Sequence, residues 1–510
     1  MKKQGFVAGA MLLMISNAVS KILGAVFKIP LTYIIGEEGM AVYNSAFGIY
    51  IMFLSFIISG LPFAVSKLVS EYSASGDIKK LSYTVRLSNA ILLFAGFFGS
   101  LCLYFFADFF ALAVREEKAV FAIKMIAPSV FFVALGTTAR SYFQGISNML
   151  PTAVSQITEA VIKLGAGYIL AVKLSPLGIP AAAGGAVLGV AIGEAAATAV
   201  FLGAFIFSRH GFLPCHAEDK KSVRAALFNI AVPLLFSAVV SSLLSVADTG
   251  IMRAGLIGYG CAPNEARRVY GAYTGYAMTV LHLPVGILAT LGVSILPVIA
   301  GSLSVNDMRR ARNAARGAVM LSVVMSVPCS VIVFFMSDEL LSILFGNSAS
   351  SVMLAASAPC IIMLSVINII TAMLRSAGKI ITVFAYTSVL ALLKILMCAV
   401  LMPAFGIYGA IASSNICCFL ELIVSVYIIK KKLGLKFGIS ETIIKPALGA
   451  AAMILCISLV KEPLLSFIKK DVFAAAVICV FSLSVYAGTL ALSGSAALSR
   501  LFLFGRSKNS

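Results

Sequence analysis

One face of the first apolar run of the chain, residues 5–35, carries polar side chains. The residues on that face are Asn17, Lys21, Gly24 and Lys28, with spacings of four, three and four. This spacing places all four on one side of a helix. Two ammonium groups could bind a phosphate or another anion, and the glycine would let a ligand approach closely. The alternative is that the lysines form structural ion pairs or reach a membrane surface.

A second polar face has the same spacing, in the run 152–172. Its residues are Thr152, Gln156, Glu159 and Lys163. Glu159 precedes Lys163 by four residues, the favourable order for an ion pair within one helix. The pair could neutralise itself or contribute to a polar cavity, and in both cases we expect this face to point to the protein interior.

Three charged residues of the second half are also candidates. Lys394 lies in the apolar run 380–402 and needs a carboxylate partner, and Asp248 and Glu421 are the two candidates. They could couple transport to an ion or serve structure alone. His282, just before Pro284, could relay protons or simply be a packed residue.

The sequence gives no sign of catalytic or metal-binding chemistry. Its ten cysteines lie mostly in apolar runs without paired spacing, which argues against a disulfide framework and a metal site. The G-x-x-x-x-G-K-[ST] phosphate loop is also missing, so we expect no ATP hydrolysis by this chain. We therefore expect no cofactor and no enzymatic activity.

The elements that must position these residues are membrane helices. Of 510 residues, 61% are apolar and 12% are charged, whereas soluble domains carry about a quarter charged residues. Apolar runs of about 20 residues or more recur throughout. We predict an all-α integral membrane protein with about fourteen transmembrane helices: 5–35, 41–66, 87–107, 119–139, 152–172, 179–208, 225–250, 271–300, 317–337, 350–374, 380–402, 406–429, 440–460 and 472–499.

Three details of these helices are also predicted. The first run is too long for a signal peptide and lacks a small-residue cleavage site, so it should be retained, with Pro30 disrupting its outer end. Gly185, Gly189 and Gly193 form a row that indicates close helix packing. The longest external segment, about 251–270, is too short for a catalytic domain.

Basic residues predict the orientation. With an even number of helices, 25 of the 39 Lys and Arg lie on the side of both termini, 9 on the other side and 5 at membrane depth. The positive-inside rule makes the side with the termini cytoplasmic and the loop with Glu37 and Glu38 external. This bias explains the net charge of +19 without nucleic acid, and it favours anionic lipids of the inner leaflet.

Five features recur in order along the chain with nearly constant offset, which indicates an internal duplication. Four of the pairs are Ala127-Pro128 with Ala358-Pro359, Lys163 with Lys394, Gly178-Ile179 with Gly406-Ile407, and Glu194 with Glu421. An offset of six helices gives a parallel repeat. We predict an N-lobe at 1–215, a C-lobe at 216–435 and two extra helices at 436–510. Two pseudo-twofold bundles with a cavity between them are typical of alternating-access transporters.

Several segments resemble the family of stage V sporulation protein B. They are Gly60-Leu61-Pro62, Ser66 to Glu71, Tyr142-Phe143-Gln144-Gly145 and Gly275 to Thr279. This polysaccharide-transport branch belongs to the multidrug/oligosaccharidyl-lipid/polysaccharide exporter superfamily and is similar to the MurJ-type lipid II flippases. The resemblance implies two lobes around a V-shaped cavity, with helices 13 and 14 forming a groove for a lipid tail.

The resemblance extends in part to single residues. Ser20 to Gly24 matches the first-helix motif of MurJ-type proteins, with Lys21 in place of Arg, and Lys28 lies one residue past their second Arg. Their helix-8 Arg falls near Thr279, and their helix-2 Arg has no counterpart here. Val246 to Thr249 resembles a segment that gives an Asp to a sodium site in some MurJ-type proteins.

The resemblance implies a flippase that moves an undecaprenyl-diphosphate-linked saccharide across the cytoplasmic membrane for cell-wall assembly. The expected partners are this lipid substrate, membrane lipids and proteins of cell-wall synthesis. A cation-coupled multidrug exporter of the same superfamily is the main alternative, although it should present carboxylates rather than ammonium groups. The other alternative, a membrane enzyme acting on lipid-linked sugars, would need catalytic residues on sizeable external loops.

Overall fold

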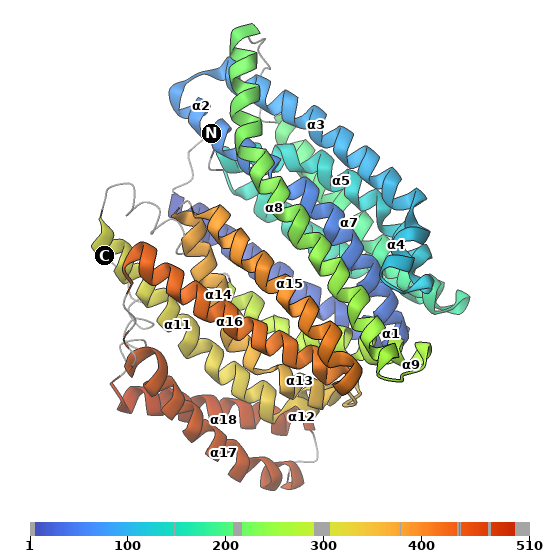
Figure 1. The fold of residues 1–510 in the computed structure, drawn as a ribbon, viewed down its shortest axis with the longest axis vertical. Helices are drawn as coiled ribbons and strands as arrows, with labels where there is room; N and C mark the ends of the chain where they lie inside the picture. The colour runs from blue at the N-terminus through green and yellow to red at the C-terminus, as the bar shows by residue number, and fades with distance from the viewer. Residues whose placement is uncertain are drawn as a thin grey trace. The chain divides into compact units, whose positions relative to one another are not determined.

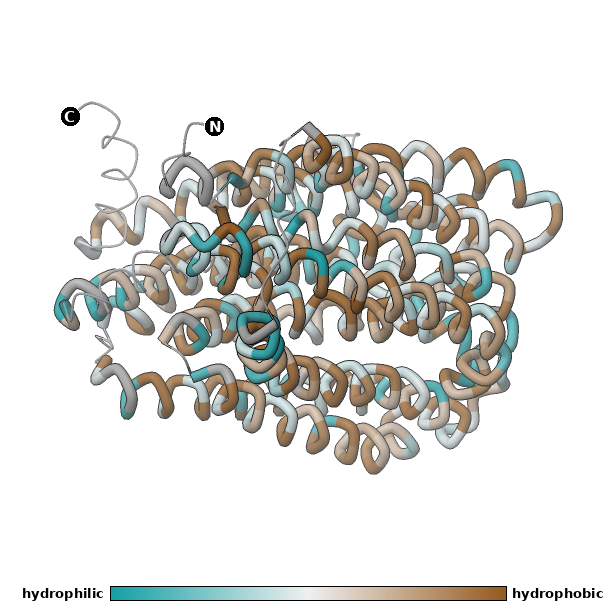
Figure 2. Tube along the Cα trace, turned by 90° about the horizontal axis from the view of Figure 1, so that it is seen from above, coloured by the Kyte–Doolittle hydropathy of each residue, from teal (hydrophilic) through white to brown (hydrophobic). Residues whose placement is uncertain are grey.

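The computed structural model describes residues 6–146, 148–207, 217–289, 307–377, 379–435, 438, 440–467 and 471–494. Within these ranges the regular structure is entirely helical. Twelve described helices are long and apolar enough to cross a membrane, or up to thirteen if one bent pair counts as a span. Figure 2 shows apolar residues recurring along most of the helices. The all-α membrane fold is confirmed, and the exact count of fourteen stays a prediction.

The longest helix, α1 (Phe6–Ile58), contains a sharp kink at Gly36, where φ is 63° and ψ is −170°. This combination of φ and ψ is accessible essentially to glycine alone, and would strain another residue by about 1–3 kcal/mol. The expected disruption at Pro30 is wrong, because the helix continues through it. At about 1.5 Å per residue, both 6–35 and 37–58 could span a bilayer. Counting them separately would raise the described candidates from thirteen to fourteen.

The described chain divides into two compact units, of which the first comprises Met1–Gly275 and Ala391–Gly406. Besides α1 it contains α2 (Leu61–Ser75), α3 (Ile78–Phe105), α4 (Ala107–Ala113), η1 (Glu117–Ala119), α5 (Val120–Gly145), α6 (Leu150–Leu174), η2 (Ser175–Leu177), α7 (Ile179–Phe207), α8 (Ala217–Gly258), α9 (Pro263–Ala272) and the end of α15 (Ile380–Phe405). Figure 1 shows α3 and α5 side by side in this unit, in agreement with their contacts.

Glycines allow α6 and α7 to pack closely. A Cβ added at Gly189 would lie 2.2 Å from the Gly167 Cα, and one at Gly185 would lie 2.6 Å from the Leu170 carbonyl oxygen. At Gly193 the corresponding distance to the Glu159 carbonyl oxygen is 2.9 Å. These approaches leave no room for a larger residue, so the prediction of close packing for this glycine row is confirmed.

The second unit comprises Tyr276–Leu390 and Ile407–Ser510. Its described helices include α11 (Met308–Phe335), α12 (Ser337–Phe345), α13 (Ser351–Ser357), α14 (Pro359–Ser376), α16 (Ile407–Leu433), η4 (Ser440–Ile444), α17 (Lys445–Phe467) and α18 (Asp471–Leu492), together with the first part of α15. The π-helical turn η3 (Tyr273–Ala277) spans the division between the units. One apolar core joins α17 and α18 to α11 and α14, and Figure 1 shows α17 and α18 (red) beside each other.

These units group the helices differently from the repeat. Helix α8 and the end of α15 belong by their contacts to the first unit, whereas the repeat assigns both to the C-lobe. The boundaries at 215 and 435 therefore stay predictions about the duplication. Locally the repeat has equivalents: Gly178 (φ 105°) and Gly406 (φ 57°) each precede a helix, α7 or α16.

Two predicted boundaries near the outer end of α8 differ from the structure. Most of the expected loop 251–270 is helical, because α8 continues to Gly258 and α9 begins at Pro263. The span predicted at 271–300 is described only to residue 289, and its remainder lies outside the described residues. The polar residues within 251–270 therefore mark a turn between α8 and α9 that is shorter than the predicted loop.

Candidate functional site

The two predicted polar faces lie on neighbouring helices. The Ser16 hydroxyl donates to Gln156 Oε1 at 2.9 Å, and the Ser20 hydroxyl donates to the Gln156 backbone oxygen at 3.1 Å. Further along, Gly167 of α6 packs closely against the Phe27 ring of α1. The Ser16–Gln156 and Phe27–Gly167 contacts both join residues 140 apart in the sequence, so α1 and α6 run parallel. Their polar faces therefore meet along a shared seam.

The ammonium groups near this seam have different surroundings. Lys21 is exposed, whereas Asn17, Lys28 and Lys163 are half-buried. Lys28 and Lys163 are close enough for their charges to repel each other. The Lys163 ammonium also lies 5.0 Å from the centroid of the Phe47 ring, a cation–π distance. The face shared by α1 and α6 is therefore rich in positive charge.

Of the two alternatives for Glu159 and Lys163, the intrahelical ion pair is not formed. No ion pair joins them among the described residues, although their spacing permits one. Lys163 faces the aromatic ring of α1 instead. Tertiary packing has displaced a local pair that contributes only about 0.2–0.5 kcal/mol in an isolated helix.

Sequence reasoning missed a buried polar cluster beside Glu159. The Tyr50 hydroxyl donates to Glu194 Oε1 at 3.0 Å, and both side chains are buried. Arg140 and Glu159 lie close enough to act electrostatically on Glu194, and the Arg140 guanidinium stacks 5.2 Å from the Phe201 centroid. In the sequence, Glu194 serves only as a marker of the repeat. Its position one residue after Gly193, inside an apolar helix, was the available signal.

Lys394 pairs with Asp248 and not with Glu421. Its ammonium lies 2.7 Å from Asp248 Oδ2, and the side chains are 29% and 18% exposed. The other carboxylate oxygen, Oδ1, is buried and has no hydrogen-bond partner among the described residues. Glu421 is half-buried in the second unit and makes no ion pair there among the described residues. The first unit thus holds a complete Lys–Asp pair, while a role in coupling stays a prediction.

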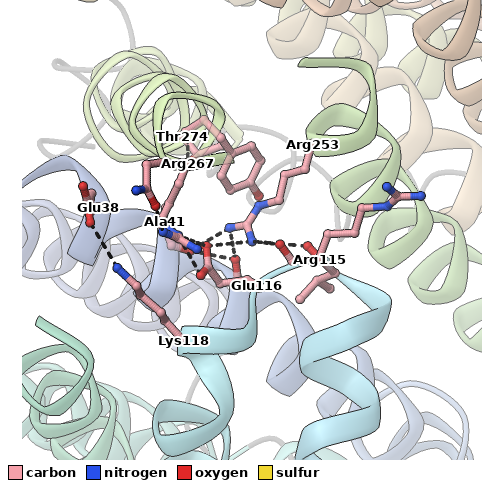
Figure 3. Close-up of polar contacts among 12 residues, drawn as sticks. Glu38, Ala41, Arg115, Glu116, Lys118, Arg253, Arg267 and Thr274 are labelled. Carbon is pink, nitrogen blue, oxygen red and sulfur yellow. Dashed lines mark hydrogen bonds and ion pairs between the residues drawn. The ribbon is translucent and has the colours of Figure 1, made fainter. Parts of the chain in front are cut away.

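A larger charged cluster, also missed from the sequence, lies at the predicted outer end of the first unit (Figure 3). Buried Glu116 accepts from Arg253 at 2.9 Å and from Arg267 at 2.8 Å. Arg253 also donates to the Ser45 hydroxyl at 2.6 Å and stacks 4.5 Å from the Tyr270 ring centroid. This cluster ties α8 and α9 to α1 and to the loop before η1, which suits a structural role.

The comparisons with known proteins agree with this helical architecture. The family model described as polysaccharide biosynthesis protein matches residues 6–303, more than half of the chain. The chain belongs to the polysaccharide biosynthesis protein family. A second model, MatE, matches residues 272–400. The predicted membership of the MATE-like exporter superfamily is thereby confirmed.

Relatives of this polysaccharide biosynthesis protein span most of its length. "Stage V sporulation protein B" of Bacillus subtilis (strain 168) is 27% identical over 463 residues, 89% of each chain. "Lipid II flippase MurJ" of the same organism is 24% identical over 458 residues, 84% of each chain. A solved structure titled "Lipid II flippase MurJ, inward closed conformation" aligns with a TM-score of 0.70 at 18% identity, covering 94% of this chain and 98% of that one. This likeness establishes the fold.

Proposed function

We propose that this polysaccharide biosynthesis protein is a flippase for an undecaprenyl-diphosphate-linked saccharide, a lipid II-like precursor, and that it works by alternating access. The observation that carries the proposal is the positively charged face formed by α1 and α6. Lys21, Lys28 and Lys163 bring three ammonium groups to this part of the first unit. Its sequence relatives include a stage V sporulation protein and a lipid II flippase, which supports the same class of substrate.

The charge of the substrate explains why ammonium groups are needed. A diphosphate cannot cross hydrocarbon alone, because an unpaired ion in a low-dielectric medium carries a large desolvation penalty. Lysines that face one another across α1 and α6 would repel when empty and be stabilised by an anion between them. Lysine recognises phosphate as a point charge, without the bidentate geometry of arginine, so this site should hold the diphosphate with less geometric specificity than arginines would.

The long isoprenoid tail requires an apolar surface. Helix α17 exposes Leu448, Leu455 and Leu459, and α18 exposes further apolar side chains. We propose that this apolar surface of the second unit holds the tail. The protein would work in the cytoplasmic membrane with both termini in the cytoplasm, alongside proteins of cell-wall synthesis.

A multidrug exporter is the second candidate, favoured by the match to the MatE model and by the buried carboxylate of Glu194. A cationic drug would seek such carboxylates. However, Glu194 is already hydrogen-bonded by Tyr50 and lies near Arg140, which reduces its attraction for a cation. The ammonium groups of Lys21 and Lys28 in the first part of α1 favour an anionic substrate.

Flipping can be measured with purified protein in liposomes that contain lipid II in both leaflets. An impermeant amine-reactive reagent added outside labels only head groups in the outer leaflet. We expect the wild-type protein to bring nearly all lipid II within reach of the reagent, whereas protein-free liposomes should leave the inner pool unlabelled.

Two further arms identify the substrate class. An undecaprenyl-diphosphate saccharide without the peptide, detected by an impermeant glycosidase, tests whether the diphosphate is sufficient. A cationic dye tests the exporter alternative. Dye transport without movement of either lipid, under conditions in which a MurJ protein flips lipid II, would reject the proposal.

A further inference from the structure

A buried carboxylate of α7 has no role in the proposed function. Glu194 is 8% exposed and accepts a hydrogen bond from the Tyr50 hydroxyl at 3.0 Å. Among the described residues, no ion pair joins Glu194 to a lysine or an arginine. A carboxylate buried in this way, with a neutral hydroxyl as its hydrogen-bond partner, needs another source of charge compensation.

Close packing places Glu194 beside the charged face of α6. A Cβ added at Gly193 would lie 2.9 Å from the Glu159 carbonyl oxygen and 3.2 Å from the Lys163 Cβ. Glu194 follows Gly193 directly, and the charges of Glu159 and Lys163 both act on its carboxylate. Glu194 is therefore close to one of the ammonium groups that we assign to the diphosphate.

Each long helix that packs against α7 contributes a charged or titratable group close to Glu194. The helices are α1, α5 and α6. The groups are Tyr50 from α1, Arg140 from α5, and Glu159 and Lys163 from α6. With both carboxylates ionised, the two negative charges cancel the two positive ones, so the cluster has no surplus charge for an anion. A proton on Glu194 leaves one positive charge in excess.

A diphosphate beside Lys163 would change the energy of the ionised carboxylate. Lys163 attracts an ionised Glu194, and an anion bound to Lys163 offsets that attraction. The ionised form of Glu194 would then have two negative neighbours, Glu159 and the diphosphate, in a buried place. Like charges in one site favour protonation of one member, because negative charges out of water repel each other strongly.

We propose that Glu194 is a proton-binding site that is coupled to the anionic substrate. A proton from water adds to a carboxylate oxygen of Glu194 and removes its negative charge, while the diphosphate lies beside Lys163. Each ligand strengthens the binding of the other by the same factor, because coupling between two sites is reciprocal. The coupling rests on the proposed function, since Lys163 has to meet the diphosphate.

Affinity measured against pH tests the coupling, with undecaprenyl diphosphate as the probe and the purified full-length chain in detergent. The range runs from neutral to mildly alkaline pH, above the pH at which the phosphates of the probe take up protons. The affinity of the wild-type protein should fall roughly tenfold as the pH rises, a typical size for coupling between sites. The fall has this sign because loss of the proton returns a negative charge next to Lys163.

Glu194→Gln is the variant that tests the assignment. Glutamine cannot ionise, and its amide oxygen can still accept from Tyr50, so the affinity should stay high at alkaline pH. Any slope that remains in this variant belongs to the lysines and the probe. Glu421→Gln is the matched control, because Glu421 is the counterpart of Glu194 in the predicted repeat and lies half-buried in the second unit. It should keep the wild-type dependence on pH.

Two further readouts detect the proton itself. In weakly buffered solution at mildly alkaline pH, the wild-type protein should take up protons when undecaprenyl diphosphate is added, and Glu194→Gln should take up fewer. Infrared difference spectra of the same addition should show a growing band of protonated carboxyl groups that Glu194→Gln lacks. A carboxylate with a purely structural role would give neither signal. Thermal unfolding verifies that each variant is folded, and proton uptake by the wild-type protein needs no variant.

Three results would overturn the proposal. The first is the same dependence of affinity on pH in the wild-type protein and in folded Glu194→Gln. The second is binding of undecaprenyl diphosphate by the wild-type protein without proton uptake. Both would leave the proposed function intact, because the diphosphate still binds. The third, no binding of the probe at any pH, would overturn the coupling and the proposed function together.

Discussion

The lysines in apolar helices differ in the groups that surround and compensate their charges. Lys394 has a carboxylate at 2.7 Å, Lys163 lies over an aromatic ring, and Lys21 is exposed. A charge at the centre of a membrane helix costs about 2.5–3.5 kcal/mol by insertion scales, so each arrangement needs a compensating interaction. Lys21 is the one whose compensation is best supplied by a substrate.

Replacing Lys21 tests this directly. Lys21→Ala should reduce flipping roughly 10- to 100-fold, because a hydrogen bond to a charged group contributes about 1.5–3 kcal/mol. Lys21→Arg should stay active, since it keeps the charge. The measurement is the rate of lipid II exposure in liposomes, with equal protein per vesicle. Full activity of the alanine variant at normal abundance would show that α1 does not handle the diphosphate.

The Lys394–Asp248 pair gives a second prediction at this scale. Breaking a fully buried pair costs about 3–5 kcal/mol, and the partial exposure of these side chains should keep the cost below that. Lys394→Ala should therefore lower the thermal stability by leaving Asp248 uncompensated. The double variant with Asp248→Asn should recover part of the loss, and Lys394→Ala with Glu421→Gln is the matched control without rescue. Equal rescue by both would contradict a specific pair.

The same pair predicts flipping without sodium. A metal cation bound at Asp248 would be repelled by the ammonium 2.7 Å from that carboxylate, strongly so in a low-dielectric site. Lys394 would act as a tethered cation, and the membrane potential or protons would drive transport. Flipping rates in vesicles prepared with sodium or with choline should be equal. A strict requirement for sodium would refute this role for Lys394.

At this scale the sequence predicted types of partner better than identities. That Lys394 needs a carboxylate follows from the cost of a buried charge, but the choice between Asp248 and Glu421 depends on helix packing that spacing does not encode. The ion pair between Glu159 and Lys163 is absent for the same reason, because Lys163 lies over the Phe47 ring of α1 and not beside Glu159. Arg253 and Glu116 are not candidates from the sequence, and only the fold reveals their contact.

At the scale of elements, a glycine and not a proline interrupts the first helix. Pro30 lies inside α1 without ending it, whereas Gly36 adopts the positive φ that divides the helix. A proline within a helix has no N–H to donate, so one backbone carbonyl oxygen loses its partner. Neighbouring groups in a membrane bundle can satisfy that oxygen. The predicted spans 5–35 and 41–66 therefore separate at the correct place, for a reason other than the expected one.

The glycine row gives a matched pair of variants in α7. Gly189→Ala would place a methyl group 2.2 Å from the Gly167 Cα, where backbone must move, and overpacking typically costs about 1–3 kcal/mol. Gly203→Ala meets nothing within 4 Å and should be neutral or slightly stabilising. Thermal unfolding in detergent compares the two. Equal stability of both variants would contradict close packing of α6 and α7.

For the whole molecule, the sequence predicts the class of fold and a duplication. The contacts in the structure group the helices differently from that duplication. Offsets of about 230 residues predict common ancestry of two halves, whereas the compact units show which helices pack together. A helix such as α8 can belong to one half by descent and to the other unit by contact. Periodicity along the chain carries no information about that choice.

The last prediction concerns the orientation of the whole chain. Both termini should be cytoplasmic, because 25 of 39 basic residues lie on that side and 9 on the opposite one. Single cysteines at Lys508, Lys79 and Lys118, in a background without the ten native cysteines, test it in intact cells. An impermeant maleimide should label Lys118→Cys, whose native side chain is 42% exposed, and should reach the other two only after permeabilisation. Labelling of Lys508→Cys from outside, with Lys118→Cys protected, would invert the topology.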